Sequence, residues 1–201
     1  MRGRRVGQLF FALSLSLISS TVFSSVLTTS SVLQSIASGE RDYSYYRELL
    51  INSDGDTSTF GAVCEAIARI ELEKTYPEKD YLITGSIEYS HGHRTLGELD
   101  VVILRRSDRE AVLIGEVKCW KNLDRARKKA VKQLTRFKVT MNQNTPIQFH
   151  AKDHAPYARV NFDESPRFVM IAQQGAVSHG FDMELPISLD SAKSLASDLS
   201  Y

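Results

Sequence analysis

The stretch GELDVVILRRSDREAVLIGEVK, residues 97–118, has the pattern of two apolar strands joined by a charged turn. Its centre, RRSDRE, is polar, whereas both flanks carry runs of valine, isoleucine and leucine. Apolar runs that lack strict alternation are typical of strands buried on both faces of a sheet. Asp100, Glu116 and Lys118 interrupt the pattern, because each puts a charge where a buried strand calls for an apolar side chain.

A turn centred near Asp108 determines which residues of the two strands face each other. Residues about equally far from Asp108 along the chain are paired, so Asp100 faces Glu116 and Glu98 faces Lys118. Side chains two residues apart share a face, so all four are expected to point the same way. Taken singly, Glu98 and Lys118 would make an ordinary cross-strand ion pair.

The two facing carboxylates of Asp100 and Glu116 require an explanation of their own. Burying both would be costly, and their mutual repulsion would raise the pKa of one of them, so a cation must offset the pair. A divalent metal does this best, and Mg²⁺ prefers oxygen ligands from one or two carboxylates plus water.

Periodicity and turn signals predict the order of the surrounding elements. Helices are expected over residues 43–51, 58–76, 121–139 and 191–199, the last of them capped by Asp190. Strands are expected over residues 81–89, 99–104, 111–118, 167–172 and 186–189, and a loop over residues 90–95. This order predicts one α/β domain, residues 43–201, in which helices flank a mixed β-sheet.

The first 24 residues have the composition of a secretory signal peptide. Three arginines precede an apolar run, and Val22 and Ser24 suit the positions before a cleavage site. Cleavage after Ser24 would give an exported chain, periplasmic or secreted, with no stable membrane association. An uncleaved membrane anchor is the alternative, although polar residues within the run weaken a spanning helix. Residues 25–42, rich in serine and threonine, are expected to form a linker or a loosely ordered arm.

Charge is concentrated in one segment. The chain has 25 basic and 24 acidic residues. The first 24 residues contain three arginines and no acid, so their removal would leave 22 basic and 24 acidic residues. A polyanion must therefore be held by a local patch. Residues 121–138 carry eight basic residues and one acid, so this helix is either a phosphate-binding surface or a solvated face. The candidate nucleic-acid contacts are Lys121, Arg125, Lys128, Lys129, Lys132 and Arg136.

The chain has two cysteines, Cys64 and Cys119. An exported chain meets an oxidising compartment, which permits a disulfide. Their expected positions, on a helix and at a strand end, favour two separate small buried side chains.

Asp100, followed after fifteen residues by Glu116-Val117-Lys118, resembles the D…ExK core of the PD-(D/E)XK nuclease superfamily. That superfamily includes type II restriction enzymes and archaeal Holliday-junction resolvases. The segments GELD and GEVK are especially similar to the resolvase-like branch. The resemblance covers roughly residues 58–140. It implies a restriction-endonuclease-like fold, a mixed β-sheet flanked by helices with an α-β-β-β-α-β core.

The resemblance also implies a metal-dependent endonuclease or exonuclease that hydrolyses phosphodiester bonds of nucleic acid, with DNA favoured. Asp100 and Glu116 would bind Mg²⁺, or Mn²⁺ in its place, together with the backbone carbonyl of Val117 and water. Lys118 would position or help deprotonate the attacking water and neutralise the charge that develops on the phosphate. Resolvase-like members often dimerise, so the resemblance leaves a homodimer open.

Two further site residues follow from the same resemblance. Its members have an acid on the helix before the first strand, and Glu65 is chosen here to hold a metal-bound water. Glu71 is the fallback, because the helical wheel does not decide between the two. Gln133, one helical turn before Phe137, matches a glutamine of some branches and would orient Glu116 or touch a phosphate.

Two other interpretations of the sequence stay open. One is a non-catalytic nucleic-acid-binding module of the same fold, and the other is a membrane-tethered interaction protein. The intact set of Asp100, Glu116 and Lys118 argues against the first of these, because a degenerate site usually loses one member.

Overall fold

The computed structural model describes residues 42–53, 57–143, 145–151, 156–163 and 165–200. All of them belong to one unit that spans residues 39–201. The expected signal peptide, residues 1–24, lies outside the described ranges, as do residues 25–41 of the expected arm. A helix over residues 42–51 is found as predicted. No helix in the described part of the chain combines the length and the apolar character needed to cross a membrane.

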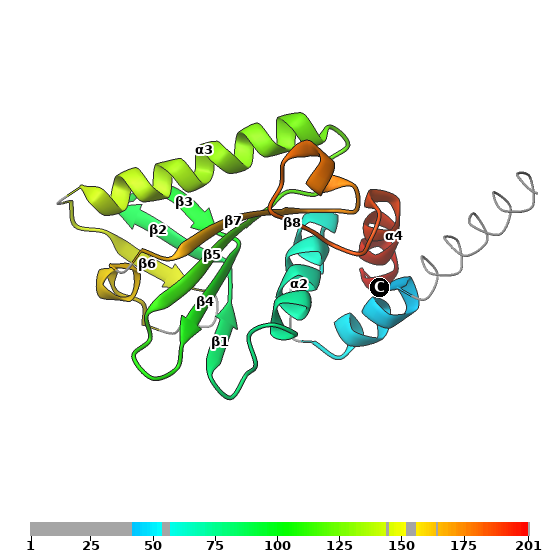
Figure 1. Ribbon diagram of the computed structural model, residues 1–201, viewed down its shortest axis with the longest axis horizontal. Helices are drawn as coiled ribbons and strands as arrows, with labels where there is room; N and C mark the ends of the chain where they lie inside the picture. The colour runs from blue at the N-terminus through cyan, green and yellow to red at the C-terminus, as the bar shows by residue number, and fades with distance from the viewer. Residues whose placement is uncertain (1–41, 54–56, 144, 152–155, 164, 201) are drawn as a thin grey trace, which may run out of the picture. The chain divides into compact units, whose positions relative to one another are not determined.

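A mixed five-stranded sheet forms the centre of the structure (Figure 1). Its strands are, in spatial order, β1 (Tyr81–Thr84), β4 (Val101–Arg105), β5 (Ala111–Val117), β7 (Arg167–Ala172) and β8 (Met183–Glu184). Strand β4 runs antiparallel to both β1 and β5, whereas β7 runs parallel to β5 and β8 parallel to β7. The α/β class with a mixed sheet and flanking helices is therefore confirmed.

The hairpin of β4 and β5 has the register that a turn centred on Asp108 predicts. Three pairs match it, Val101↔Gly115, Val102↔Ile114 and Ile103↔Leu113. The register then shifts between Ile103 and Leu104, on the side of the turn. Arg109 adopts a positive φ of 62° in that turn. The irregularity stays at the turn, so the expected register holds at the end near Asp100 and Glu116.

Side chains of β4 and β5 alternate between two apolar cores. Val101, Ile103, Leu113 and Val117 pack into a core shared with helices α2 (Phe60–Glu73) and α4 (Leu189–Leu199). Val102, Leu104 and Ile114 pack into a second core, to which helix α3 (Leu123–Asn142) contributes Leu134 and Phe137. Both strands have apolar runs because helices cover both faces of the sheet, so that side chains pointing either way are buried.

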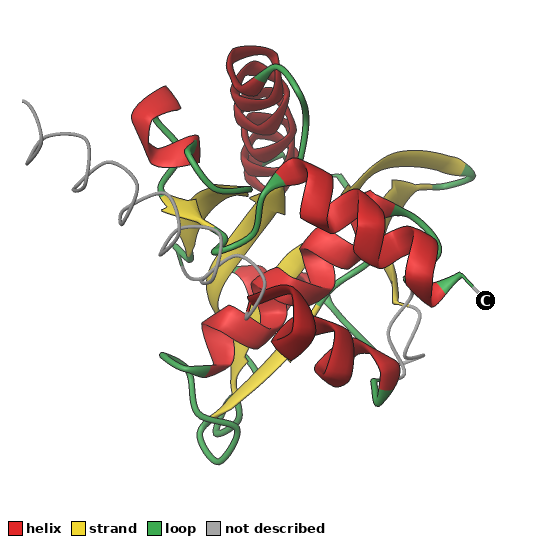
Figure 2. Cartoon of the chain, turned by 90° about the vertical axis from the view of Figure 1, so that its right-hand side faces the viewer, coloured by secondary structure: helices red, strands yellow, loops and turns green. Residues whose placement is uncertain are grey.

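Helices α2, α4 and 42–51 gather on one side of the molecule, the side that faces the viewer in Figure 2. Helix 42–51 is attached through two tyrosines. The hydroxyl of Tyr46 donates to Glu71 of α2, and the hydroxyl of Tyr43 donates to Asp198 of α4. Glu71 therefore belongs to this contact between helices.

A second, three-stranded sheet was not predicted. It has the order β3 (Arg94–Leu99), β2 (Ile87–His91) and β6 (Gln148–Ala151). The predicted strand over residues 81–89 is divided between the two sheets at Gly85 and Ser86, and Ser86 has a positive φ of 52°. The predicted loop over residues 90–95 is mostly strand, because Gly92, with a φ of 57°, allows a tight turn between β2 and β3.

The boundaries of α2, α3 and α4 differ from prediction by a few residues, and each of these helices has a side-chain cap at its N-terminus. Thr59 caps α2 and Asn122 caps α3, so Lys121 precedes the helix. Ser188 caps α4 by accepting from the N–H of Ser191, so the predicted cap, Asp190, is wrong. The predicted strand over residues 186–189 is also wrong. Pairing with β7 is made by β8 instead, and Pro186 beyond it has no N–H to donate.

Cys64 and Cys119 form a disulfide, so the expectation of two separate buried cysteines is wrong. Cys64 lies on the buried face of α2, and Cys119 follows β5 by two residues. Their Cα atoms are 6.5 Å apart, because α2 packs against the end of the sheet where β5 finishes. Nothing in the spacing of the two cysteines along the chain indicates this packing.

Candidate active site

Asp100, Glu116 and Lys118 come together where β4 begins and β5 ends. Lys118 Nζ lies 2.9 Å from Asp100 Oδ2 and forms an ion pair with Glu116 Oε1. The same ammonium group donates to the carbonyl of Val117 at 2.9 Å. The N–H of Val117 donates to Asp100 Oδ2 at 2.8 Å, so the aspartate is held by both the backbone and the lysine.

This cluster is almost fully removed from solvent. Asp100 is 5% exposed and Glu116 is 1% exposed, while the side chain of Lys118 is 12% exposed. Burial raises the pKa of Glu116 well above its usual range, and the charge of Asp100 raises it further. Burial lowers the pKa of Lys118, but the two carboxylates outweigh that effect and the net shift is upward. Lys118 is therefore the cation that offsets the facing acids.

Glu98 does not pair with Lys118, contrary to expectation, although its charge helps to raise the pKa of Glu65. It lies on β3, where its partner across the strands is Glu88. The chain bends at Asp100, between β3 and β4, so residues on either side of the bend belong to different sheets. The alternation of side chains cannot be carried across such a bend.

Of the two helix acids, Glu65 is the one coupled to the cluster. Burial raises the pKa of Glu65 to about 7, and the charge of Asp100 adds to that rise, whereas Arg69 and Lys118 oppose it. Glu71 faces helix 42–51 instead, where it accepts from Tyr46 and, at 2.6 Å, from Lys74. The choice of Glu65 over Glu71 therefore has electrostatic support.

Arg69 is a charged residue coupled to Glu65 and Asp100 that the sequence interpretation missed. It lies one helical turn after Glu65, and burial lowers its pKa while Glu65 and Asp100 raise it. A side chain at Gly85 would meet the carbonyl oxygen of Asp100 at 2.1 Å and Arg69 Nη1 at 2.9 Å. The absence of a side chain at Gly85 therefore allows the backbone before β2 to approach Asp100 and Arg69 closely. The acid and base four residues apart on one helix were the available signal.

Gln133 lies on α3 and is half-buried. Its Oε1 is buried without a hydrogen-bond partner among the described residues. Phe137, one turn later, is 1% exposed and packs edge-on against Tyr89, with the centres of the two rings 5.1 Å apart. The role of Gln133 therefore stays a prediction.

The predicted nucleic-acid contacts form one exposed strip, here called the basic flank, which comprises Lys121, Arg125, Lys128, Lys129, Lys132 and Arg136. Spacings of three and four residues keep the five members on α3 along one side of the helix. Arg136 donates to the carbonyl of Leu96 on β3 at 2.6 Å. Burial raises the pKa of Tyr89, and the charges of Arg136 and Glu116 both act on it. The Arg136 end of the basic flank is therefore attached to β3 of the small sheet.

The opposite side of α3 has a different environment. Arg127 donates to the carbonyl of Gly180 at 3.0 Å, and Lys138 lies 4.0 Å from the centre of the Phe168 ring. These two cations contact the structure around β7. They provide a matched comparison for the basic flank.

The acid cluster offers a small set of oxygen ligands. Among the described residues, no group of three or more His, Cys, Asp or Glu side chains is placed to hold a metal ion. Asp100 and Glu116 are two carboxylates, and Val117 adds a carbonyl. Magnesium needs only one or two protein carboxylates, since water completes its coordination.

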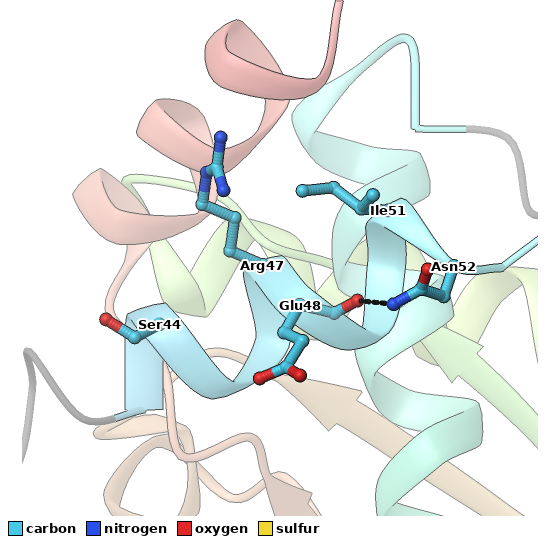
Figure 3. Close-up of a pocket in the computed structure, with 5 residues that line it drawn as sticks. All are labelled: Ser44, Arg47, Glu48, Ile51 and Asn52. Atoms are coloured by element: carbon cyan, nitrogen blue, oxygen red, sulfur yellow. Dashed lines mark hydrogen bonds between the residues drawn. The ribbon is translucent and has the colours of Figure 1, made fainter.

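A hollow of about 360 Å³ lies elsewhere, along helix 42–51 (Figure 3). Its lining residues are Ser44, Arg47, Glu48, Ile51 and Asn52. Asn52 donates to the backbone carbonyl of Glu48 at 2.9 Å, which is a local helix contact. None of the predicted site residues lines this hollow, so the acid cluster is the better candidate.

Comparison with protein-family models, with curated proteins and with solved structures finds no match to this chain.

Proposed function

We propose that this chain is a metal-dependent nuclease that hydrolyses phosphodiester bonds of nucleic acid, with DNA as the favoured substrate. The observation that carries the proposal is the convergence of Asp100, Glu116 and Lys118 in one buried cluster. Buried carboxylates are costly unless they are paired, and here one lysine is shared by two of them. Such an arrangement suits a binding site for a divalent cation better than a support for the fold.

The proposal includes a restriction-endonuclease-like fold. In its support, α2, β1, β4, β5, α3 and β7 follow one another in the order α-β-β-β-α-β, and β2, β3 and β6 are insertions into that order. The acid cluster lies on the second and third strands of this core. The helix that follows carries the basic flank.

Magnesium, or manganese in its place, fits the oxygen ligands of the cluster. Glu116 Oε1 is buried and has no hydrogen-bond partner among the described residues, although the charge of Lys118 lies beside it. Asp100, Glu116 and the carbonyl of Val117 would hold the ion. When bound, it would polarise the scissile phosphate and lower the pKa of a coordinated water.

The directions of the pKa shifts suggest different catalytic roles for Lys118 and Glu65. Because the net shift raises the pKa of Lys118, this group keeps its proton and stabilises negative charge on the phosphate. Glu65, with a pKa of about 7, can take a proton from water near neutral pH. We therefore assign the proton acceptor to Glu65 and the electrostatic role to Lys118.

Export through the N-terminal segment is part of the proposal. The Cys64–Cys119 disulfide supports it, since such bonds persist in oxidising compartments and are rare in the cytosol. The alternative of a membrane anchor concerns residues outside the described ranges. Mass spectrometry of the protein from its native host should find a chain that begins near residue 25, and a full-length cytosolic product would contradict export.

A cleavage assay tests the nuclease proposal. The purified, oxidised protein is incubated with plasmid DNA and Mg²⁺, with and without EDTA, and in parallel with RNA. We expect cleavage only where Mg²⁺ is free, and none with the Asp100→Asn variant. A folded wild-type protein that cleaves neither DNA nor RNA with Mg²⁺ or Mn²⁺ would overturn the proposal.

A further inference from the structure

The only disulfide that this chain can form within itself joins the two elements that carry the candidate active site. Cys64 directly precedes Glu65 on α2, and Cys119 directly follows Lys118. The bond spans 55 residues of sequence. Each end of the bond is thus one residue away from a side chain to which we assign a role.

We propose that the Cys64–Cys119 disulfide positions the residues of the active site. The site is correctly assembled in the oxidised chain, whereas in the reduced chain Glu65 is displaced from it. Its consequence for cleavage rests on the proposed nuclease function. Neither cysteine is a catalytic residue, because neither is expected to touch the substrate. The bond acts through Glu65 and Lys118.

The physical reason is the space that two sulfur atoms need. Bonded sulfurs lie about 2 Å apart, whereas heavy atoms that are not bonded pack about 3.5–4 Å apart. Reduction therefore requires a separation larger by about 1.5 Å. Cys64 is 0% exposed and Cys119 is 3% exposed, and a close-packed interior has no spare volume to absorb such a change. We therefore expect one of the two elements to move, because the packed core leaves little room for either cysteine to rotate about χ1.

The element that moves is α2. The strand end is held by directional bonds, since the N–H of Lys118 donates to the carbonyl of Ile171 at 2.9 Å and the N–H of Val117 donates to Asp100 at 2.8 Å. The part of α2 next to Cys64 is held against the sheet by apolar side chains such as Val63 and Ile67, which can slide. Reduction should therefore displace Glu65 and leave the cluster of Asp100 and Lys118 together.

This asymmetry predicts a specific kinetic effect. Displacing a catalytic group by about 1 Å can cost about 10²-fold in rate. Because Asp100, Glu116 and the basic flank keep their places, Mg²⁺ affinity and KM should change little. Reduction should thus act on kcat alone.

The chemistry of the switch is thiol–disulfide exchange. The two thiols lose their protons and two electrons as the Cys64–Cys119 bond forms, and the disulfide of the oxidant, such as oxidised glutathione, is cleaved to two thiols. A reducing cytosol keeps the cysteines as thiols. The enzyme would therefore be idle where it is made and active after export, which would spare the nucleic acid of the producing cell.

The test compares the full chain in its oxidised form with the same chain after reduction by dithiothreitol. We expect reduction to lower kcat on DNA about 10²-fold, with KM and calorimetric Mg²⁺ affinity almost unchanged, and oxidised glutathione to restore it. The double variant Cys64→Ala, Cys119→Ala lacks both sulfurs and is the matched control. Its kcat should be the same with and without dithiothreitol.

Three results would overturn the inference. One is an unchanged kcat in the reduced chain, and another is a parallel loss of kcat and Mg²⁺ affinity. The third is loss of the far-ultraviolet circular dichroism on reduction, because the bond would then support the fold rather than the site.

If neither form cleaves nucleic acid, the proposed function fails and amide hydrogen exchange tests the positioning by itself. Faster exchange on reduction around Cys64, with unchanged protection at Val117 and Lys118, would support it. Equal exchange in both forms would overturn it.

Discussion

The ammonium nitrogen of Lys118 lies 2.9 Å from Asp100 Oδ2, and so joins the residue after β5 to the residue before β4. Lys118 also pairs with Glu116, so one cation faces two buried carboxylates. When both acids are ionised, the cluster carries a net negative charge in a region of low dielectric. Such a charge attracts a further cation strongly. This relationship is the basis of the nuclease proposal.

Glu65 and Glu71 can be distinguished with the same substitution at each position. Glu65→Gln removes the group that can accept a proton near neutral pH, and we expect kcat to fall by about 10²-fold or more. Glu71→Gln weakens the contacts with Tyr46 and Lys74, so we expect a loss of about 1 kcal/mol in the free energy of unfolding. Steady-state kinetics and urea unfolding of both variants check this. The reverse pattern would make Glu71 the helix acid.

The two sides of α3 should differ in their effect on nucleic-acid binding. Lys128→Ala with Lys132→Ala removes two members of the basic flank, so affinity should fall uniformly across sequences. The slope of log K against log salt should become shallower by about one unit for each phosphate that the variant no longer binds.

The matched control for the basic flank is Arg127→Ala with Lys138→Ala, which removes the same charge from the opposite side of α3. Its slope should stay that of the wild type. Salt titrations in EDTA, where cleavage is absent, make the comparison. Equal slopes for both double variants would place the binding surface elsewhere.

The stability of the metal-free protein should fall as pH rises. The pKa of Glu65 is about 7 in the folded chain, against an ordinary value of 4.5, and the pKa of Glu116 is also raised. At a pH between the ordinary pKa and the raised pKa, the two glutamates have lost their carboxyl protons in the unfolded chain but keep them in the folded chain. The stabilisation is complete below about pH 4.5 and is lost as pH rises through about 7.

Urea unfolding in EDTA at several pH values between 5 and 8 measures this loss, which we expect to be about 1–3 kcal/mol. The Glu65→Gln variant is the control, because its curve should be flatter than that of the wild type. Wild-type stability that rises over this range would contradict the raised pKa values.

The hairpin could be predicted from the sequence because its information is local. The turn at Asp108 and the apolar runs fix the register, and the register places Asp100 beside Glu116. Four strands of the central sheet and its flanking helices follow from the same patterns, whereas the fifth strand, β8, was missed. Glu65 needed the family resemblance, since its own helix offered more than one acid.

The features that were missed depend on contacts between distant segments. The break at Gly85 is caused by the approach of the Asp100 backbone, and β6 joins β2 from 57 or more residues away. The disulfide depends on how α2 packs against the end of β5. Glu98 was misplaced for the same reason, because the bend at Asp100 transfers the chain from one sheet to the other.

In the proposed nuclease, Asp100 holds the metal ion and Lys118 acts on the phosphate. Asp100→Asn keeps the shape of the side chain but removes a charge that the ion needs. Lys118→Ala keeps both carboxylates and removes the cation. Both variants should lose cleavage, by about 10²-fold or more, for different reasons.

Calorimetric titration of Mg²⁺ into the two variants, alongside the plasmid cleavage assay, separates these reasons most directly. We expect Asp100→Asn to lose Mg²⁺ binding, whereas Lys118→Ala should bind Mg²⁺ at least as tightly as the wild type and still not cleave. An Asp100→Asn variant that binds Mg²⁺ and cleaves DNA at the wild-type rate would show that Asp100 is not the metal ligand of a nuclease.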